Sequence, residues 1–285
     1  MIRIFGFKKN RKIRTLGLGV FDGIHKAHQT IAERCDTLLT FFPHPDWFLG
    51  KDKGLKMLTT LREQRYYFDN LVVLHFTEKL SNMSAITFLE EIVYKRLQPE
   101  EIVIGSDYRF GYKAEGCQDL LKSWANDRGI KVYIVPENSI DNIPVKSSYI
   151  RDLLHKDEFS TALKFLGHSY LITGKVIRGE GRARDMGFPT SNLKVPSFKL
   201  IPQAGVYKGT ALLQNSEYRA LIYVGRKPTF GKREVGVEVH IHNFSGNIYR
   251  NHLNVFLETK IRHEIRFANQ EELVQQIKKD MSFIL

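Results

Sequence analysis

The sequence predicts an α/β fold followed by a β fold: a parallel sheet covered by helices, then a small antiparallel barrel that ends in a helix. Up to about residue 150, short apolar runs alternate with helix-like segments. That alternation is typical of a parallel sheet with helices on both faces. After residue 167, short strand-like segments follow one another, separated by turns rich in glycine, proline and asparagine. This second pattern is typical of a small barrel.

The first half is expected to contain five strands with helices between them. Apolar runs cover 13–20, 37–42, 71–76, 101–105 and 130–135, and helical spacing covers 27–35, 61–69 and 86–97. In such sheets ligands bind beyond the carboxyl ends of the strands. The residues directly after positions 20, 42 and 105 are therefore the first places to search for chemistry.

The second half is expected to begin with two helices, at 147–154 and 158–166. Short strands follow at 170–177, 206–213, 218–224, 235–241 and 253–257, and an amphipathic helix covers 270–283. The change of pattern predicts a first domain at 1–151, a helical linker at 152–168 and a second domain at 169–285. A length of 285 residues agrees with two domains.

Composition excludes several classes of protein. Hydrophobic residues make up 42% of the chain, which is typical of globular proteins. No apolar run reaches the roughly 20 residues that a membrane helix needs, and the N-terminus resembles no secretory signal, so we expect a cytoplasmic protein. Cys35 and Cys117 lack the spacing of a zinc site or a disulfide framework. The net charge of +12 is compatible with nucleic acid, an anionic membrane or phosphorylated ligands, and charge alone does not choose among them.

The sharpest local signal in the first half lies at 19–29, where the first strand is expected to turn into the first helix. His25 and His28 are three residues apart at the start of that helix, so their rings lie on one side. The free N–H groups of a helix N-terminus favour anions, and Gly19 and Gly23 let the backbone approach a ligand closely. Together these features predict a triphosphate site. The alternative is that one histidine caps the helix and the other is a surface residue.

Segment 19–28, GVFDGIHKAH, resembles the histidine signature of the nucleotidyltransferase superfamily. More narrowly, it resembles that of the bifunctional bacterial riboflavin kinase/FMN adenylyltransferase family, also called FAD synthetases. Segments 41–45 (FFPHP), 104–111 (IGSDYRFG) and 145–151 (VKSSYIR) resemble further motifs of this family in the same order. The sequence departs from the family pattern at Ala27, Lys146 and Tyr108, where the family has glycine, serine and phenylalanine.

The resemblance implies a Rossmann-like nucleotidyltransferase domain that adenylylates FMN. It implies that His25 and His28 act in adenylyl transfer, and that Asp107 and Phe110 bind the flavin. The residues that it implies for ATP and its phosphates are Gly19, Phe21, Gly23, Ser147, Ser148 and Arg151. Little acid–base chemistry is needed, because the phosphate of FMN is already a competent nucleophile toward the α-phosphate of ATP.

Segment 174–192, GKVIRGEGRARDMGFPTSN, resembles the riboflavin kinase signature of the same family. The resemblance implies that Gly174, Gly179 and Gly181 belong to a loop that holds ATP. It also implies that Thr190 and Asn192 bind Mg²⁺ and the ATP phosphates. A hydroxyl and an amide carbonyl are suitable oxygen ligands for this hard cation. The alternative is a glycine-rich surface hairpin.

Segment 237–242, VEVHIH, alternates strictly, so Glu238, His240 and His242 face away from the apolar residues between them. By resemblance Glu238 is the general base of the kinase, and Arg262 lies near the flavin. The alternatives are an ordinary solvent-facing glutamate and a metal pair of histidines, although no third metal ligand is evident. Arg250 stands where the family usually has glycine.

The sequence as a whole predicts an enzyme with two reactions. The second domain phosphorylates riboflavin to FMN with ATP and Mg²⁺, and the first then adenylylates FMN to FAD and releases pyrophosphate. The expected partners are riboflavin, FMN, FAD and ATP, without nucleic acid or membrane, in a monomer or weak homo-oligomer. One alternative is a riboflavin kinase whose adenylyltransferase is weakened or lost through Ala27 and Lys146. A more remote alternative is a basic nucleic-acid-binding or regulatory protein on the same fold.

Overall fold

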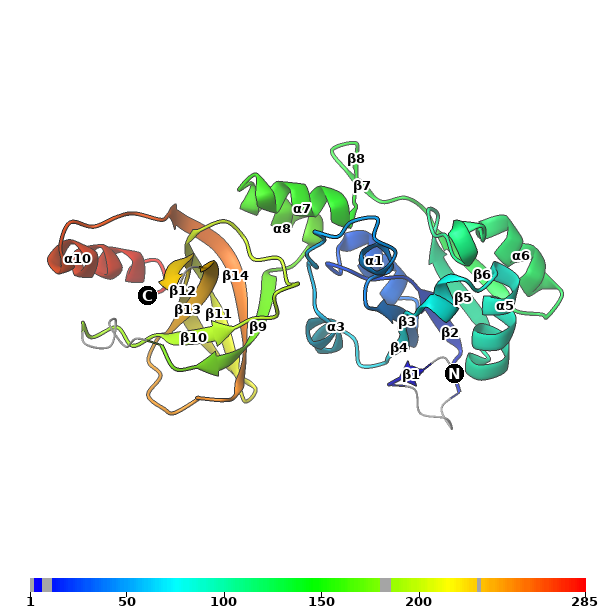
Figure 1. Ribbon diagram of the computed structural model, residues 1–285, viewed down its shortest axis with the longest axis horizontal. Helices are drawn as coiled ribbons and strands as arrows, with labels where there is room; N and C mark the ends of the chain where they lie inside the picture. The colour runs from blue at the N-terminus through cyan, green and yellow to red at the C-terminus, as the bar shows by residue number, and fades with distance from the viewer. Residues whose placement is uncertain (1–2, 7–11, 180–185, 230–231) are drawn as a thin grey trace. The chain divides into compact units, whose positions relative to one another are not determined.

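The computed structural model describes residues 3–6, 12–179, 186–229 and 232–285. The chain divides into two compact units, residues 1–147 and 148–285 (Figure 1). In the described part of the chain, no helix is both long enough and apolar enough to span a membrane. Each unit has its own sheet.

The first unit is built on a six-stranded, mostly parallel sheet. Its strands are β1 (Ile4–Phe5), β2 (Thr15–Leu18), β3 (Thr37–Phe42), β4 (Leu71–His75), β5 (Glu101–Gly105) and β6 (Lys131–Val135). Their order is β1-β4-β3-β2-β5-β6, and only β1 runs antiparallel to its neighbour. The prediction of a parallel sheet is confirmed. The two-residue edge strand β1 was not predicted, because two residues are too few to show a period.

The order of the strands fixes where a ligand site belongs. β2 lies in the middle, with β3 on one side and β5 on the other, so the chain reverses its direction of progress across the sheet between β2 and β5. In doubly wound sheets the crevice at this point, beyond the carboxyl ends of the strands, is the usual ligand site. The residues that follow β2 and β5 therefore face the same edge of the sheet.

Both faces of this sheet are buried. Leu16, Leu18 and Ile102 pack in one apolar cluster, whereas the alternating positions Leu38 and Val103 pack in a second cluster. A parallel sheet that is covered on both faces reads as nearly continuous apolar runs. That is why its strands could be predicted from their sequence.

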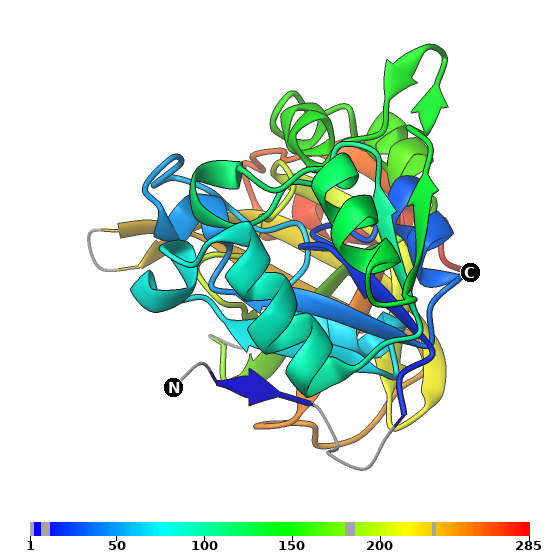
Figure 2. The same cartoon turned by 90° about the vertical axis from the view of Figure 1, so that its right-hand side faces the viewer.

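The helices of the first unit partly match the expected ones. They are α1 (Lys26–Ala32), α2 (Pro45–Phe48), α3 (Leu61–Tyr67), α4 (Glu78–Ser81), α5 (Ala85–Phe88), a π-helix (Leu89–Leu97), a 3₁₀ turn (Tyr112–Ala114) and α6 (Gln118–Asn126). The predicted helix 86–97 is real, but most of it has i to i+5 hydrogen bonding, which residue spacing cannot distinguish from an α-helix. The polar helix α6 was missed. A short hairpin of β7 (Ser139–Ile140) and β8 (Ile143–Pro144) projects from the unit (Figure 2).

The second unit contains a closed antiparallel barrel. Its strands are β9 (Tyr170–Ile177), β10 (Ser191–Lys194), β11 (Gly205–Leu213), β12 (Ser216–Thr229), β13 (Lys232–Ile241) and β14 (His252–His263), in the order β10-β13-β12-β11-β14-β9. Ile222, Val239 and Val255 are completely buried. The predicted barrel is confirmed. β10 was not predicted, because the sequence Ser-Asn-Leu-Lys holds one apolar residue.

Among the described residues, the helices α7 (Ser147–His155), α8 (Phe159–Leu166) and α10 (Gln270–Met281) accompany the barrel. Asp157, between α7 and α8, forms an ion pair with Lys260 of β14 at 2.5 Å, and the Phe159 ring packs on the Tyr207 ring at 5.0 Å. The segment that was predicted as a linker, 152–168, thus packs on the barrel. The domain boundaries 1–151, 152–168 and 169–285 stay a prediction. The terminal helix α10 is present as expected.

Candidate functional sites

The turn after β2 has an unusual backbone. Phe21 and Ile24 have φ angles of 54° and 48°, and Gly23 has a φ of 87°. Residues other than glycine, asparagine and aspartate rarely adopt this left-handed backbone conformation, and a β-branched isoleucine is among the least suited to it. A turn of this kind persists only where the surrounding structure holds it.

Side chains from distant parts of the chain hold this turn. Thr59 accepts a hydrogen bond from the Gly23 N–H at 2.8 Å, and its own N–H donates to the Asp22 carboxylate at 2.9 Å. The Ser147 hydroxyl donates to the Asp22 carbonyl at 2.8 Å. Gln64 donates from Nε2 to two further carbonyl groups of the turn. The sequence analysis gave roles to neither Thr59 nor Gln64, because only the folded chain brings them to the turn.

The turn delivers His25 and His28 as a stacked pair. Their ring centroids are 3.6 Å apart, with 16° between the planes. His25 caps α1: its Nδ1 accepts from the His28 N–H at 3.4 Å, which leaves its ring proton on Nε2. The Phe21 ring stands edge-on to His28, with the centroids 5.3 Å apart. The two predicted histidines thus lie together at the switch point of the sheet.

Burial, and then the neighbouring His25, hold the pKa of His28 well below its usual value. The imidazole of His28 is therefore neutral near pH 7 before any ligand binds. A neutral imidazole can donate a hydrogen bond to a phosphate oxygen, but it brings no full charge. Its Nδ1 atom is buried and has no partner among the described residues.

Two residues predicted for this site belong to the protein interior instead. The side chain of Phe21 is completely buried and packs over Gly19 and against Phe68, so only its backbone is placed to meet a nucleotide, and its assignment stays a prediction. Phe110, predicted to bind the flavin, has 7% of its surface exposed and packs on Phe88 and Tyr108 in the core. Phe21 packs against His28, and Phe110 packs against Tyr108, next to the predicted flavin residue Asp107. Aromatic residues in a motif can serve the core or a ligand, and the motif alone does not say which.

The remaining residues predicted for the first half are Asp107, Ser148 and Arg151, and their roles stay predictions. Asp107 is exposed, just after β5 and therefore at the same sheet edge as the turn after β2. Ser148 and Arg151 lie on α7, on the second-unit side of the division of the chain. Lys146, which replaces a serine of the family motif, pairs with Glu137 at 3.4 Å on the surface.

In the barrel, strand pairing assembles the second site. Asn192 of β10 stands directly opposite Glu238 of β13 in the antiparallel register. The Thr190 hydroxyl donates to the Glu238 carboxylate at 3.1 Å. A Cβ on Gly179 would lie 2.0 Å from Nδ2 of Asn192, so the asparagine amide occupies the space that the glycine leaves open. Four of the predicted kinase residues are thus brought together.

Two other glycines of the kinase motif were predicted to belong to the loop that holds ATP. Gly174 lies inside β9, where a Cβ would meet the Leu193 Cβ at 2.8 Å, so close packing of strands accounts for this glycine. Gly181 lies outside the described residues.

His240 fixes the start of the Thr190 segment. Its Nδ1 lies 2.9 Å from the Pro189 carbonyl, and its ring is edge-on to Phe188 at 6.2 Å. Burial lowers the pKa of His240, with the Pro189 carbonyl opposing this effect and His242 adding to it. The described residues contain no cluster of three or more potential metal-binding His, Cys, Asp or Glu side chains. The contact with the Pro189 carbonyl gives His240 a structural part in holding the segment that leads to Thr190.

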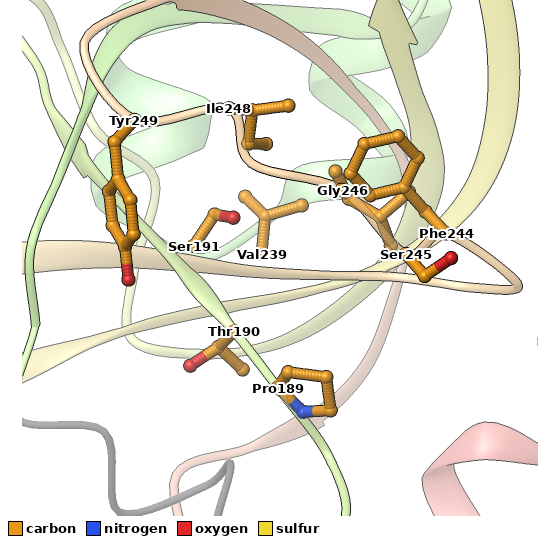
Figure 3. Close-up of a pocket in the computed structure, with 10 residues that line it drawn as sticks. Pro189, Thr190, Ser191, Val239, Phe244, Ser245, Gly246, Ile248 and Tyr249 are labelled. Atoms are coloured by element: carbon orange, nitrogen blue, oxygen red, sulfur yellow. The ribbon is translucent and has the colours of Figure 1, made fainter.

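A cavity of about 210 Å³ adjoins these residues. Figure 3 shows one wall made by residues 189–191 and the opposite wall made by the loop 244–249, with Val239 at the base. Phe244, Ile248 and Tyr249 supply apolar and aromatic surface, and Thr190 supplies a hydroxyl. The cavity suits a flat heteroaromatic group next to a polar or charged one. The loop 244–249 was not predicted as part of a site.

Two protein-family models match this chain. The family model described as FAD synthetase matches residues 7–149, and the model described as riboflavin kinase matches residues 166–284. The bifunctional riboflavin kinase/FMN adenylyltransferase of Buchnera aphidicola subsp. Schizaphis graminum is 32% identical to this chain, over 99% of the chain and 96% of its own length. The chain belongs to the bifunctional riboflavin kinase/FMN adenylyltransferase family. It is an enzyme with both activities, riboflavin kinase and FMN adenylyltransferase.

Further relatives extend this result. The protein of the same description from Haemophilus influenzae is 32% identical, over 93% of this chain and 91% of its own length. A crystal structure described as a macrolide-efflux protein from Streptococcus pneumoniae superposes with a TM-score of 0.79 at 27% identity, and the match covers 96% of this chain and 94% of that one. The arrangement of strands and helices is therefore shared with a solved structure.

Arg262, predicted to lie near the flavin, has a buried carboxylate partner, and its flavin contact stays a prediction. Its guanidinium makes three hydrogen bonds of 2.7–3.0 Å with the buried Asp280 of α10, so it holds the terminal helix on the barrel. Tyr223, which was not predicted, stands opposite Glu238 in the register of β12 and β13. The Tyr223 hydroxyl donates to Glu264. Its place opposite Glu238 follows from strand register, a signal that requires knowing which strands pair.

The donors near Glu238 fit a hard divalent cation. The Thr190 hydroxyl uses its proton on Glu238 and keeps its lone pairs, and the side-chain carbonyl of Asn192 is a second neutral oxygen. Gly179 leaves the space in which the asparagine amide sits. The residues present therefore fit Mg²⁺ together with substrate phosphates.

Proposed function

We propose that Glu238 is the general base of riboflavin phosphorylation. As the 5′-hydroxyl oxygen of riboflavin attacks the γ-phosphorus of ATP, its proton passes to the Glu238 carboxylate, and ADP leaves. The Thr190 hydroxyl, 3.1 Å from the carboxylate, orients it. A base of this kind contributes about 10²–10⁴ in rate. The observation that carries this proposal is the hydrogen bond between Thr190 and Glu238. Thr190 lines the cavity, and Glu238 lies opposite Asn192 in the strand register.

Thr190 and Asn192 would hold Mg²⁺, which when bound offsets the negative charge of the ATP phosphates. The cavity between 189–191 and 244–249 would hold the base of ATP, because its apolar and aromatic walls suit an adenine ring. Asp107 would contact the flavin in the other reaction, since it is exposed at the edge of the sheet where the histidines lie.

In adenylyl transfer, a phosphate oxygen of FMN attacks the α-phosphorus of ATP, and pyrophosphate leaves. His25 and His28 would donate hydrogen bonds to the phosphate oxygens as charge builds on them. Ser147 would act indirectly, because its hydroxyl holds the Asp22 carbonyl of the turn. Ser148 and Arg151 would bind ATP phosphates, as the family motif implies. A cytoplasmic location and a monomeric or weakly associating state complete the proposal.

The test is the substitution Glu238→Gln, with the two reactions measured separately. We expect FMN formation from riboflavin to fall about 10²–10⁴-fold, while supplied FMN is still converted to FAD at the original rate. Glu217→Gln, on the exposed part of β12, is the matched control and should change neither reaction. A folded Glu238→Gln protein that keeps its kinase activity, or that loses both reactions together, would refute the assignment.

A further inference from the structure

We propose that Gln64 of α3 is a positioning residue for adenylyl transfer. Its side-chain amide holds the strained turn after β2, and this turn sets the His25–His28 pair. The inference rests on the proposed role of the two histidines, and it adds a residue outside every motif that the sequence analysis identified.

The hydrogen bonds of Gln64 go to the backbone of the turn. Its Nε2 donates to the Val20 carbonyl at 3.0 Å and to the Phe21 carbonyl at 3.2 Å. Two carbonyl oxygens facing one amide end require the NH₂ group there, so the orientation of the amide is fixed. The Gln64 side chain has only 1% of its surface exposed, so water does not replace these bonds easily. Its Oε1 has no partner among the described residues.

The two carbonyls belong to the most strained part of the turn. Phe21 has a φ of 54°, in a region that a phenylalanine rarely adopts, and Ile24 follows with a φ of 48°. The Phe21 carbonyl has two other, longer donors, Thr59 Oγ1 at 3.4 Å and the Ile24 N–H at 3.3 Å. Gln64 is the side chain that bridges Val20 and Phe21, and it therefore opposes the relaxation of this peptide unit.

The histidines depend on the position of Phe21. The Phe21 ring is edge-on to His28 at 5.3 Å, and the His28 ring stacks on His25 at 3.6 Å. If the peptide after Phe21 rotated, the ring would move away and water would reach His28. Burial is the largest cause of the lowered pKa of His28, so this pKa would then rise toward its usual value. The position and the protonation of His28 are therefore both coupled to Gln64.

The experiment compares Gln64→Met, which keeps the length of the side chain without its donor, with Gln64→Lys, which restores a donor. For Gln64→Met we expect kcat of FMN adenylylation to fall about 10–100-fold, as misplaced catalytic groups do, with a smaller change in the KM for ATP. The titration of the His28 ring, followed by NMR, should move to higher pH, because a solvated imidazole gains its proton earlier. Gln64→Lys should recover most of the rate.

Three controls make the result decisive. Riboflavin kinase activity, measured in the same molecule, should be unchanged in all variants, and Gln118→Met on α6 should change nothing. An unchanged kcat and an unchanged His28 titration in Gln64→Met would overturn the inference if His28→Asn still abolishes adenylylation. If His28→Asn has no effect either, the proposed role of the histidines is wrong instead. If Gln64→Met does not fold, Gln64→Lys decides, since a folded but inactive lysine variant would also overturn it.

Discussion

The two proposed sites of this enzyme are assembled in different ways. In the barrel, strand register places the side chains. Asn192 lies opposite Glu238 because β10 pairs with β13, and Tyr223 lies opposite Glu238 because β12 also pairs with β13. In the first unit, an irregular turn with positive φ angles presents the histidines, and the side chains of Thr59 and Gln64 hold it from outside. The barrel arrangement follows from which strands pair, whereas the arrangement in the first unit depends on hydrogen bonds from side chains outside the turn.

Because the two sites are assembled differently, we expect them to respond differently to amino-acid substitutions. A site set by register should tolerate changes in distant residues and respond to any change in local space. A site set by a pinned turn should respond to distant substitutions that leave every catalytic group in place. The four substitutions below test this contrast, in order of decreasing expected effect.

The largest effect is expected for His28→Asn. We expect FMN adenylylation to fall about 10²–10³-fold, as in the loss of one donor to a developing charge, because asparagine cannot reproduce the stacked ring. Riboflavin phosphorylation in the same protein should be unchanged. The measurement is the rate of FAD formation from supplied FMN, and a rate within threefold of the original would remove His28 from the mechanism.

Asp280→Ala should give the next largest effect. It leaves the Arg262 guanidinium, of which 17% is exposed, without its buried carboxylate partner. Breaking a buried ion pair in this way costs about 3 kcal/mol, so denaturant unfolding of the barrel should occur at a clearly lower concentration. In the double variant with Arg262→Met, much of this loss should be recovered. An additive double variant would show that the pair does not hold α10.

Gly179→Ala tests the local space at the kinase site. The added Cβ would fall 2.0 Å from Asn192 Nδ2, so the amide must move. Overpacking of this size costs about 1–3 kcal/mol, and we expect at least a tenfold loss of kinase activity. At Gly54 a Cβ would make an ordinary contact of 3.5 Å, so Gly54→Ala is the control. Equal kinase rates in the two variants would contradict the packing argument.

The smallest effect is a gain in stability. Arg250 has a φ of 70°, in the left-handed region that glycine adopts freely. Replacing it with glycine should stabilise the barrel by about 1 kcal/mol, the typical cost of this region for other residues. Asn243, with a φ of 54°, provides the comparison, because asparagine adopts this region at lower cost and Asn243→Gly should gain less. A thermal midpoint that falls in Arg250→Gly would contradict this.

Sequence reasoning succeeded where a residue's neighbours along the chain determine its position. The strict alternation around Glu238 predicted that its side chain faces away from the apolar residues beside it. Continuous apolar runs predicted the buried strands of the parallel sheet. It failed for the four-residue strand β10, which holds one apolar residue, and it missed α6, although Leu121, Trp124 and Ala125 of that helix are buried at helical spacing. These failures concern elements whose placement depends on tertiary packing.

The same limit applies to the sites. Phe21 and Phe110 lie in family motifs, yet both side chains are buried in the core, and Arg262 pairs with Asp280. Nothing in the letters of a motif distinguishes a side chain that touches a ligand from one that supports it. Thr59 and Gln64 were missed for the opposite reason, because they lie far from the motif in sequence and meet it only through hydrogen bonds to its backbone.

The central claim is that two separate sites on one chain carry out successive reactions on a flavin. The most direct test mixes the purified Glu238→Gln and His28→Asn proteins with riboflavin, ATP and Mg²⁺ and follows FMN and FAD by chromatography. Alone, the first should leave riboflavin unchanged and the second should accumulate FMN, whereas the mixture should produce FAD. A mixture that forms no FAD, although each protein is folded and retains its remaining reaction, would contradict the claim.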